Sequence, residues 1–283
     1  MRLIGNGFST LGITALKNSL QSESQWLSID EIGYLESMCN DYLDTIAYAM
    51  EKKHIVAVVR KQNLPHIKKL CERKDIFLID LDAPFGSIGC VIMASGLGKR
   101  FGGNKLMADF NGMPLISHIL DTTLGIFQKR IVVTRQKEIK TLCENMGVEV
   151  IFHSLPHQSD TIRLGLETMT EMKSCIFCTA DQPLLSNDTV TSLALLAVNE
   201  SSKIVRPVFE KTPGSPVIFP KYMFEELLHL PTNQSGGYVI KQHSEDIQYL
   251  SIDNPYELED IDTPKDLVRL QQLSQSIDTQ KSW

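Results

Sequence analysis

Short apolar runs alternate with amphipathic helical patterns along almost the whole sequence, and this alternation constrains the fold more than any other feature. Continuous apolar strands separated by helices are typical of parallel sheets that are covered by helices on both faces. The pattern therefore predicts an α/β fold with a mostly parallel sheet. The predicted strands are WLSI (26–29), IVAVV (55–59), IFLIDL (76–81), CVIMA (90–94), RIVVT (130–134), VEVIF (148–152), CIFCTA (175–180), KIVRPV (203–208) and SPVIF (215–219).

A segment rich in proline, glycine and serine, DAPFGSIG (82–89), is the best candidate for a linker. It predicts a smaller α/β domain over residues 1–86 and a larger one over residues 87–273. Helical spacing of apolar residues predicts helices over 34–53 and 65–74 in the first domain. Residues 274–283 show no periodicity, so we expect a flexible tail there.

The formal charge of the chain is −6 at pH 7, which argues against broad nucleic-acid binding but allows one local basic loop. The segment MRLIGNGFSTLG at the N-terminus lacks the long apolar core of a signal peptide. No stretch approaches the roughly 18 apolar residues that a membrane span needs. We therefore expect a cytoplasmic protein that binds neither nucleic acid nor membrane.

Six cysteines are present, and most lie in apolar or helical segments, as is typical of buried reduced thiols. Cys175 and Cys178 form a Cys-x-x-Cys pair, a spacing that also occurs in zinc and redox sites. The pair lies in a predicted strand, where side chains three residues apart point to opposite faces of the sheet. We therefore expect neither a zinc site nor a redox pair.

The loop ASGLGKRFGGNKLM (94–107) follows the first strand of the larger domain. Its spacing does not match the phosphate loop Gly-x4-Gly-Lys-Ser/Thr. The dinucleotide fingerprint Gly-x-Gly-x-x-Gly also fails, because Gly102 follows Gly98 one residue late and Phe101 stands where glycine is needed. Closely spaced glycines let backbone N–H groups converge, so the loop predicts a nest for an anion such as a phosphate.

This loop resembles the signature of the MobA-like nucleotidyltransferases that make dinucleotide forms of the molybdenum cofactor, with the sugar-nucleotide pyrophosphorylases as more distant relatives. The resemblance covers residues 88–271 and implies a Rossmann-like nucleotidyltransferase domain. Ser215 stands where the family usually has histidine, so the role of that histidine does not transfer. The other matching segments are QSDTIRLGL (158–166), ADQPLL (180–185), GSPVIF (214–219), GGYVIKQH (236–243) and DIDTPKDL (260–267).

Nucleotidyl transfer needs amide donors for the phosphates, a cation for the leaving group and a metal that binds the phosphates. The resemblance implies that Lys105, Arg100 and Asp181 are catalytic. Arg100 and its neighbour Lys99 have a simpler interpretation as solvated surface charges. The expected nucleotide-binding residues are Ala94, Ser95, Gly96, Leu97, Gly98, Gly102, Gly103 and Lys105.

Asp181 follows a predicted strand, at the edge where ligands bind in open parallel sheets. With Asp262 it is the expected ligand set for Mg²⁺ or Mn²⁺, because such ions take a few carboxylates and complete their shell with water and phosphate. The alternatives are that Asp181 only starts a turn before Pro183, and that Asp262 only caps a helix that begins near Pro264.

Three residues at the start of a predicted helix, Ser159, Asp160 and Arg163, are expected by resemblance to bind the substrate. A salt bridge from Arg163 to Glu167, four residues later, is an equally good interpretation of that arginine. The histidines at 153, 157 and 243 lack metal-binding spacing, and we expect them to be structural or surface residues.

The N-terminal segment WLSIDEIGYLE places Asp30 and Glu31 at the end of an apolar strand. It resembles the Walker B strand of small P-loop nucleoside triphosphatases, and residues 1–86 resemble the C-terminal half of such a protein. The sequence shows no phosphate loop before this strand, so we expect no triphosphate hydrolysis. The expected role is docking or dimerisation, and the alternative is an unrelated α/β cap.

The resemblance implies an enzyme that transfers CMP from CTP to molybdopterin, with release of pyrophosphate, and that serves a molybdenum hydroxylase apoenzyme. Its closest subgroup is the cytidylyltransferase type, on the segments IDTPKDL and GGYVI. The alternatives are a guanylyltransferase that uses GTP, transfer to a sugar or alcohol phosphate, and a chaperone that binds the cofactor without catalysis.

Overall fold

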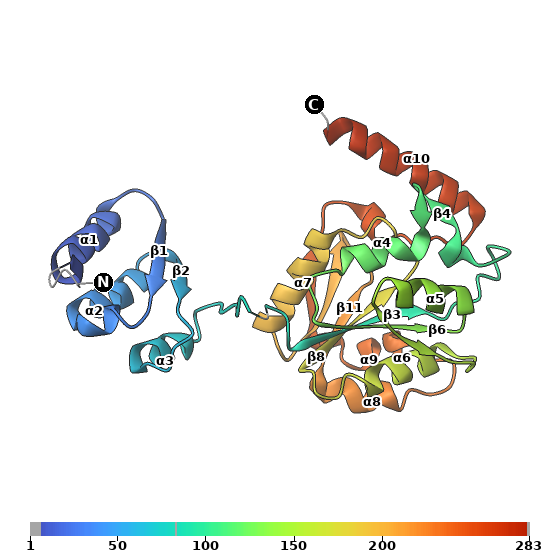
Figure 1. Cartoon of the computed structure of the whole chain (residues 1–283), viewed down its shortest axis with the longest axis horizontal. Coiled ribbons are helices and arrows are strands. Elements are labelled where there is room, and N and C mark those ends of the chain that lie inside the picture. Colours follow the sequence, from blue (N-terminus) through green and yellow to red (C-terminus); the bar gives the residue numbers. More distant parts are fainter. Residues whose placement is uncertain (1–6, 83, 282–283) are drawn as a thin grey trace. The chain divides into compact units, whose positions relative to one another are not determined.

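A computed structural model describes residues 7–82 and 84–281 of the chain (Figure 1). Contacts divide the chain into two compact units, Met1–Leu78 and Ile79–Trp283. Each unit has an apolar core of its own. The division falls a few residues before residue 86, where the sequence places the domain boundary.

The first unit packs helices against two parallel strands. Leu16, Ile29, Ile32 and Ile46 form its buried core. The helix predicted over 34–53 begins only at Asn40, because residues 36–38 form a separate 3-10 turn. The buried carboxylate of Glu36 accepts the amide hydrogen of Gly33 at 2.6 Å and stabilises this turn. The elements are a π-helical turn (Gly7–Gly12), α1 (Ile13–Gln21), β1 (Trp26–Ile32), α2 (Asn40–Met50), β2 (His54–Val59) and α3 (Pro65–Cys71).

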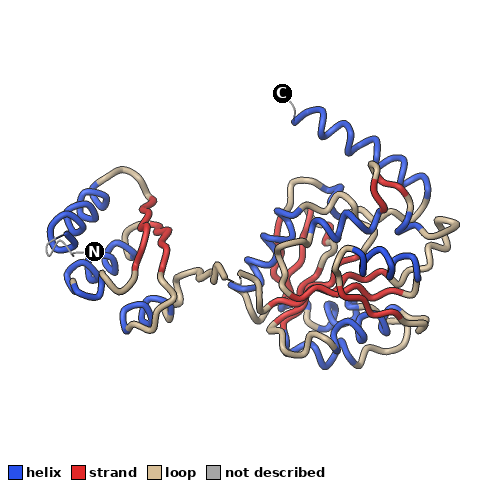
Figure 2. Tube along the Cα trace, in the orientation of Figure 1, coloured by secondary structure: helices blue, strands red, loops and turns tan. Residues whose placement is uncertain are grey.

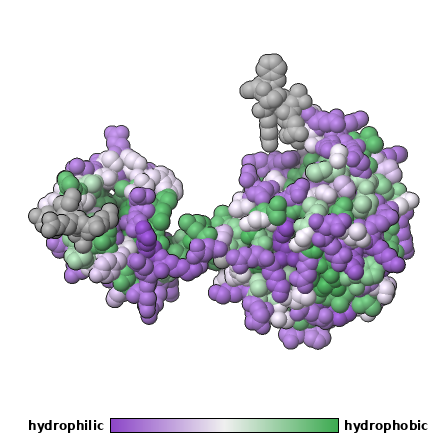
Figure 3. Space-filling model, viewed as in Figure 1, coloured by the Kyte–Doolittle hydropathy of each residue, from purple (hydrophilic) through white to green (hydrophobic). Residues whose placement is uncertain are grey.

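The strand predicted over residues 76–81 is absent, and this prediction was wrong. A strand needs a neighbour to satisfy its backbone hydrogen bonds. Within the described residues, the sheet of the first unit consists of β1 and β2 alone. The segment instead connects the two units, and Figure 3 shows apolar groups on the surface of this connection. The side chains of Phe77, Leu78, Ile79 and Leu81 are exposed.

The second unit is built on one large sheet with the order β10-β9-β11-β8-β3-β6-β7, in which β12 pairs with β9. Neighbours among β8, β3, β6 and β7 are parallel, whereas β11 runs antiparallel to β8 and β9. The predicted mostly parallel α/β fold is confirmed. The strands are β3 (Ile88–Ala94), β6 (Lys129–Thr134), β7 (Glu149–Phe152), β8 (Ser174–Thr179), β9 (Ile204–Phe209), β10 (Thr212–Pro213), β11 (Val217–Pro220) and β12 (Ile247–Ser251), with a separate hairpin of β4 (Asp109–Phe110) and β5 (Met113–Pro114).

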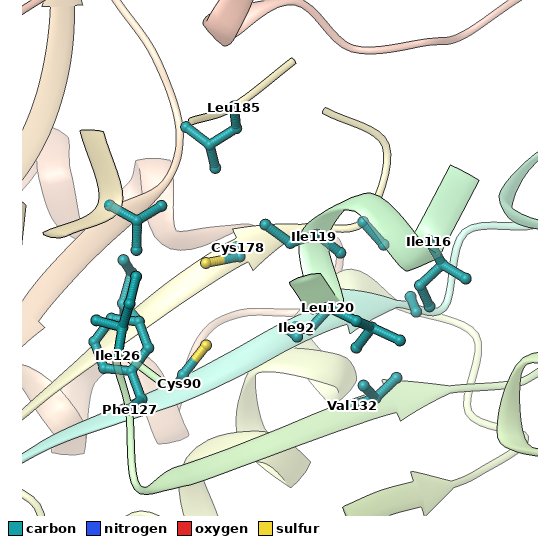
Figure 4. Close-up of a cluster of buried hydrophobic side chains, with 14 of the residues drawn as sticks. Cys90, Ile92, Ile116, Ile119, Leu120, Ile126, Phe127, Val132, Cys178 and Leu185 are labelled. Carbon is teal, nitrogen blue, oxygen red and sulfur yellow. The ribbon is translucent and has the colours of Figure 1, made fainter. Parts of the chain in front are cut away.

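Helices cover both faces of this sheet (Figures 1 and 2). Helices α4, α5, α7 and α10 contribute to the larger buried cluster, part of which Figure 4 shows, and α6, α8 and α9 contribute to the cluster on the other face. The continuous apolar strands arise from this double cover. The helices are α4 (Leu115–Thr122), α5 (Lys137–Asn145), α6 (Gln158–Glu167), α7 (Asn187–Asn199), α8 (Phe224–Leu228), α9 (Gly236–Gln242) and α10 (Pro264–Lys281).

The two thiols of the Cys-x-x-Cys pair lie on opposite faces of β8. Cys175 packs into the cluster with α6, and Cys178 packs into the cluster with α4. Burial raises the pKa of the Cys175 thiol well above its ordinary value, and the pKa of the Cys178 thiol is raised by its hydrogen bond to Cys90 and by burial. The expected divergence of the pair is confirmed, and both sulfurs are inert apolar groups at neutral pH.

The segment from residue 274, predicted to lack regular structure, continues α10 as far as Lys281. Asn111 donates to the hydroxyl of Ser274 at 3.1 Å, so part of this segment contacts the hairpin region. Among the helices that the structure describes, none combines the length and apolar character that a membrane crossing requires.

Close contact between α6 and the sheet depends on Gly165. A Cβ atom at this position would lie 2.5 Å from Cγ1 of Val91 on β3. We expect Gly165→Ala to lower the free energy of unfolding by about 1–3 kcal/mol through overpacking. Urea unfolding measures the change. Gly237→Ala is the matched control, because its Cβ would meet only Ser235 Oγ at 3.4 Å; equal stability of the two variants would contradict the tight packing.

Candidate active site

Parallel pairing of β3 with β8 brings two distant loops to the same edge of the sheet. Met93 is the register partner of Thr179, so the glycine loop and Asp181 both begin at that edge. A third segment joins them, because the amide of Ile261 donates to the carbonyl of Asp181 at 2.9 Å. Residues 94–105, 181 and 260–262 therefore meet at the carboxyl edge of the sheet, as ligand sites of such sheets do.

Lys105 lies at the centre of this meeting point, and its side chain is 10% exposed. Its Nζ donates to Asp181 Oδ2 at 2.6 Å, to Asp262 Oδ1 at 3.3 Å and to the carbonyl of Ile261 at 2.9 Å. The structure thus brings together three residues that the sequence singled out. The ammonium group bridges the two carboxylates that were expected to bind metal.

Arg100 contributes a second positive charge to the same cluster. Its Nη2 lies 2.9 Å from Asp262 Oδ2, while 73% of its side chain stays exposed. It therefore contacts the centre from the solvent side rather than standing alone on the surface. Because an exposed ion pair contributes little to stability, Arg100 can exchange this carboxylate for another anion at small cost.

Sequence reasoning missed a third carboxylate, Asp260, beside this cluster. Asp260 as a residue is exposed to solvent, but its carboxyl group is partly desolvated. This desolvation, together with the negative charges of Asp181 and Asp262, raises the pKa of Asp260 to about 6. The neighbouring Gln182 is buried: its Nε2 donates to the carbonyl of Leu258 at 3.2 Å, and its Oε1 has no partner in the described structure. Only the spacing Asp-x-Asp in the segment DIDTP hinted at Asp260.

The glycine loop turns sharply at Gly98. This residue has a φ of +59°, and a Cβ there would lie 2.3 Å from the carbonyl oxygen of Gly103. The carbonyl of Gly98 accepts the amides of Phe101 at 2.9 Å and of Gly102 at 3.0 Å. At Gly96 and Gly103 a Cβ would meet nothing within 4 Å, so the space beside the loop is open.

The remaining predicted loop residues differ in exposure. Ala94 and Ser95 are buried at the end of β3, whereas Leu97 is exposed. The Ser95 hydroxyl donates to the carbonyl of Val133 at 3.1 Å and also contacts His153 Nε2 at 2.8 Å. His153 was expected to be a structural or surface residue, and its contact with the loop depends on tertiary packing that no spacing in the sequence signals.

The predicted substrate residues lie in the first turns of α6. Ser159 is buried, and Asp160 accepts the amide of His157 at 3.1 Å as part of a capping box. Arg163 pairs with Glu167 at 2.9 Å and with Asp160 at 3.6 Å. The salt bridge that the sequence offered as an alternative is therefore present in the structure. The charges of Asp160 and Arg163 both affect the pKa of His153, which contacts Ser95 at the start of the glycine loop.

A cavity of about 840 Å³ lies elsewhere on the second unit, between the start of α7 and the loop after β12. Its lining includes the carboxylates of Asp188, Asp253 and Glu257 but none of the side chains around Lys105. No lysine or arginine is among the described residues that line this cavity, so no cation there offsets the carboxylates, whereas the site around Lys105 combines carboxylates with two cations.

Comparison with known proteins identifies the family of the larger unit. Residues 90–247, more than half of the chain, match the family model described as the MobA-like NTP transferase domain. The chain belongs to this family. Residues 3–84 match a second family model, described as NTPase, so the N-terminal unit resembles that family.

Among curated proteins, a 3-deoxy-manno-octulosonate cytidylyltransferase of Francisella tularensis subsp. holarctica is 28% identical over 114 residues, which are 38% of this chain and 45% of that protein. This chain therefore spans less than half the length of that relative. A probable molybdenum cofactor guanylyltransferase of Aquifex aeolicus is 23% identical over 186 residues, covering 64% of this chain and 89% of that protein.

Among solved structures, Rv0371c of Mycobacterium tuberculosis aligns with a TM-score of 0.59 at 19% identity, covering 65% of this chain and 97% of that one. The same protein is also known as a complex with manganese, at a TM-score of 0.55. At this identity the likeness shows the fold alone, and it confirms the α/β fold of the second unit.

The ion pair between Lys105 and Asp181 can be tested by a double-mutant cycle that compares free energies of unfolding. Lys105→Met leaves Asp181 without its cation, and Asp181→Asn leaves the ammonium without its main carboxylate, so we expect each to lower the free energy of unfolding by about 1–3 kcal/mol. The double variant should lose less than the sum, because the Lys105 ammonium and the Asp181 carboxylate are then both absent and Asp262 keeps its ion pair with Arg100. Chemical denaturation measures all three. Lys99→Met, at an exposed neighbouring position, is the control, and simple additivity would refute the coupling.

Proposed function

We propose that the chain is a metal-dependent nucleotidyltransferase that transfers a nucleoside monophosphate from a nucleoside triphosphate to a phosphorylated acceptor. The observation that carries this proposal is the bridging of Asp181 and Asp262 by Lys105, next to the glycine loop. Such a centre offers backbone donors, two positively charged side chains and paired carboxylates within a few ångströms of one another.

A divalent cation fits this donor set. Asp181 and Asp262 already converge on one positive charge, the ammonium of Lys105. In the described part of the chain no group of three or more metal-ligating side chains occurs, and Mg²⁺ suits such a site because it takes one or two carboxylates and completes its shell with water and phosphate oxygens. When bound, Mg²⁺ or Mn²⁺ supplies charge neutralisation on the phosphates.

The residues of the chain position the reactants and offset charge. An acceptor phosphate oxygen forms a bond to the α-phosphorus, and the bond from that phosphorus to the bridging oxygen breaks, so pyrophosphate leaves with the electron pair. The amides of the glycine loop hold the triphosphate. Lys105 and Arg100 turn from the carboxylates towards the leaving group, where their positive charge offsets the charge that builds up in the transition state.

For the substrates, we propose CTP and molybdopterin, with a molybdenum hydroxylase apoenzyme as the recipient of the product. The segments IDTPKDL and GGYVI support the cytidylyltransferase type, and one relative is named as a cytidylyltransferase. GTP is the second candidate, because another relative is named as a probable molybdenum cofactor guanylyltransferase. Ser159, Asp160 and Arg163 are proposed to hold the acceptor.

A panel of nucleotides tests this proposal directly. Purified full-length protein is mixed with Mg²⁺, molybdopterin and CTP, GTP, ATP or UTP in turn, and released pyrophosphate is measured. We expect pyrophosphate release to be fastest with CTP. Release with GTP alone would mean that the nucleotide is GTP rather than CTP. If the protein binds molybdopterin but releases pyrophosphate from none of the nucleotides, a chaperone is favoured instead. If pyrophosphate is released with a sugar phosphate in place of molybdopterin, the acceptor is the sugar phosphate.

Two substitutions locate the chemistry. We expect Lys105→Met and Asp181→Asn each to reduce the pyrophosphate release rate by at least about 10²-fold, because each removes a charge that acts on the transition state. Lys99→Met is the control and should retain the wild-type rate. Circular dichroism confirms that each variant is folded. Wild-type rates in the first two variants would move the reaction to another site.

A further inference from the structure

Three side chains from two neighbouring connections hold the start of the glycine loop. Arg135 Nε donates to the carbonyl of Ser95 at 2.9 Å, and Gln136 Nε2 donates to the carbonyl of Gly96 at 2.8 Å. His153, directly after β7, contacts the Ser95 hydroxyl at 2.8 Å. Arg135, Gln136 and His153 are called the loop clamp below. None of them belongs to the residues assigned above to the reaction.

The clamp fixes the direction of two backbone amides. A peptide group is planar and trans, so its C=O and N–H point in opposite directions. The Ser95 carbonyl points to Arg135, hence the amide of Gly96 points away from Arg135. The Gly96 carbonyl points to Gln136, hence the amide of Leu97 points away from Gln136. The clamp thereby orients the first two donors of the proposed anion nest.

The hydrogen-bond partners of His153 also determine which of its two ring nitrogens carries the proton. The Ser95 hydroxyl has one proton, which it donates to the carbonyl of Val133. His153 Nε2 must then carry a proton and donate it to Ser95 Oγ. Its Nδ1 accepts the amide of Leu155 at 3.2 Å. His153 is therefore neutral, with its single proton on Nε2.

We propose that His153 is a positioning residue for the nucleotide: it holds the Ser95 hydroxyl and, with Arg135 and Gln136, orients the amides of Gly96 and Leu97 towards the phosphates. This inference rests on the proposed function of the glycine loop. It assigns to a histidine outside the reacting centre the role of pre-organising the binding site, so its loss weakens nucleotide binding more than it slows the chemical step.

Two substitutions of His153 separate its two hydrogen bonds. The amide nitrogen of His153→Gln reaches the position of Nε2 and keeps the donor to Ser95. The carbonyl of His153→Asn occupies the position of Nδ1 and keeps only the bond to Leu155. We expect His153→Asn to raise the KM for the nucleotide by about tenfold with kcat within about threefold, since one oriented hydrogen bond is lost. His153→Gln should restore a KM close to wild type, and equal KM values in the two variants would overturn the proposal.

The pH profile gives a second readout. Burial lowers the pKa of His153 below its ordinary value of 6.5, with Arg135 and Arg163 acting in the same direction and Asp160 opposing them. A lowered pKa means that the neutral form of His153 is favoured in the folded protein. The contribution of this neutral form to holding Ser95 is lost as the pH falls from 6.5 through the folded-state pKa. Protonated Nδ1 then faces the amide of Leu155 donor to donor. We expect the nucleotide KM of the wild type to rise over this range relative to that of His153→Gln; parallel profiles would contradict the role of His153.

Hydrogen exchange separates this inference from the proposed function. Exchange of a peptide covering residues 95–104 is compared in His153→Asn, His153→Gln and the exposed control His229→Asn. Faster exchange in His153→Asn alone supports the clamp even if the wild type binds no nucleoside triphosphate, in which case the proposed function fails by itself. Equal exchange in all three overturns the clamp. If His153→Asn does not fold, Gln136→Ala removes the donor to Gly96 and should give the same faster exchange.

Discussion

The parallel pairing of β3 with β8 is the constraint on which the whole site depends. It runs in register from Ile88 opposite Ser174 to Met93 opposite Thr179, so both strands end together and release their loops at one edge. The backbone bond from Ile261 to Asp181 then adds the segment before α10. Without this register, Lys105 and the carboxylates of Asp181 and Asp262, which are distant in sequence, would not share one centre.

Charge is the reason why we propose a polyphosphate with a divalent ion as the ligands of this centre. The carboxylates of Asp181, Asp260 and Asp262 outnumber the cations of Lys105 and Arg100, and desolvation opposes the charged form of Asp260. In the resting protein Lys105 itself balances two of these carboxylates. A bound metal ion would take over that balance and leave Lys105 and Arg100 available for phosphate, so the same side chains serve stability at rest and charge compensation during the proposed reaction.

Much of the fold and part of the site could be predicted from the sequence. Continuous apolar runs with helices between them indicated the doubly covered parallel sheet, and the glycine loop with Lys105, Asp181 and Asp262 indicated the centre. The run over 76–81 misled, because apolar composition cannot show whether a partner strand exists. The run IVAVV does form β2 as predicted, but the residues of β2 alternate between exposed and half-buried, so the sheet of the first unit is covered less completely than the sequence suggested.

The sequence by itself determined which residue types are available: glycines that permit the turn at Gly98, cations in the loop after it, and an aspartate, Asp181, just beyond the end of a strand. Only the tertiary structure decided which of these groups meet. Asp260 carries only the weak signal of its Asp-x-Asp spacing, and the loop clamp of Arg135, Gln136 and His153 carries none, because the partners of these residues come from other connections of the sheet. Local patterns reflect backbone preference and burial, whereas convergence of side chains depends on strand order and register, which form only when the chain packs.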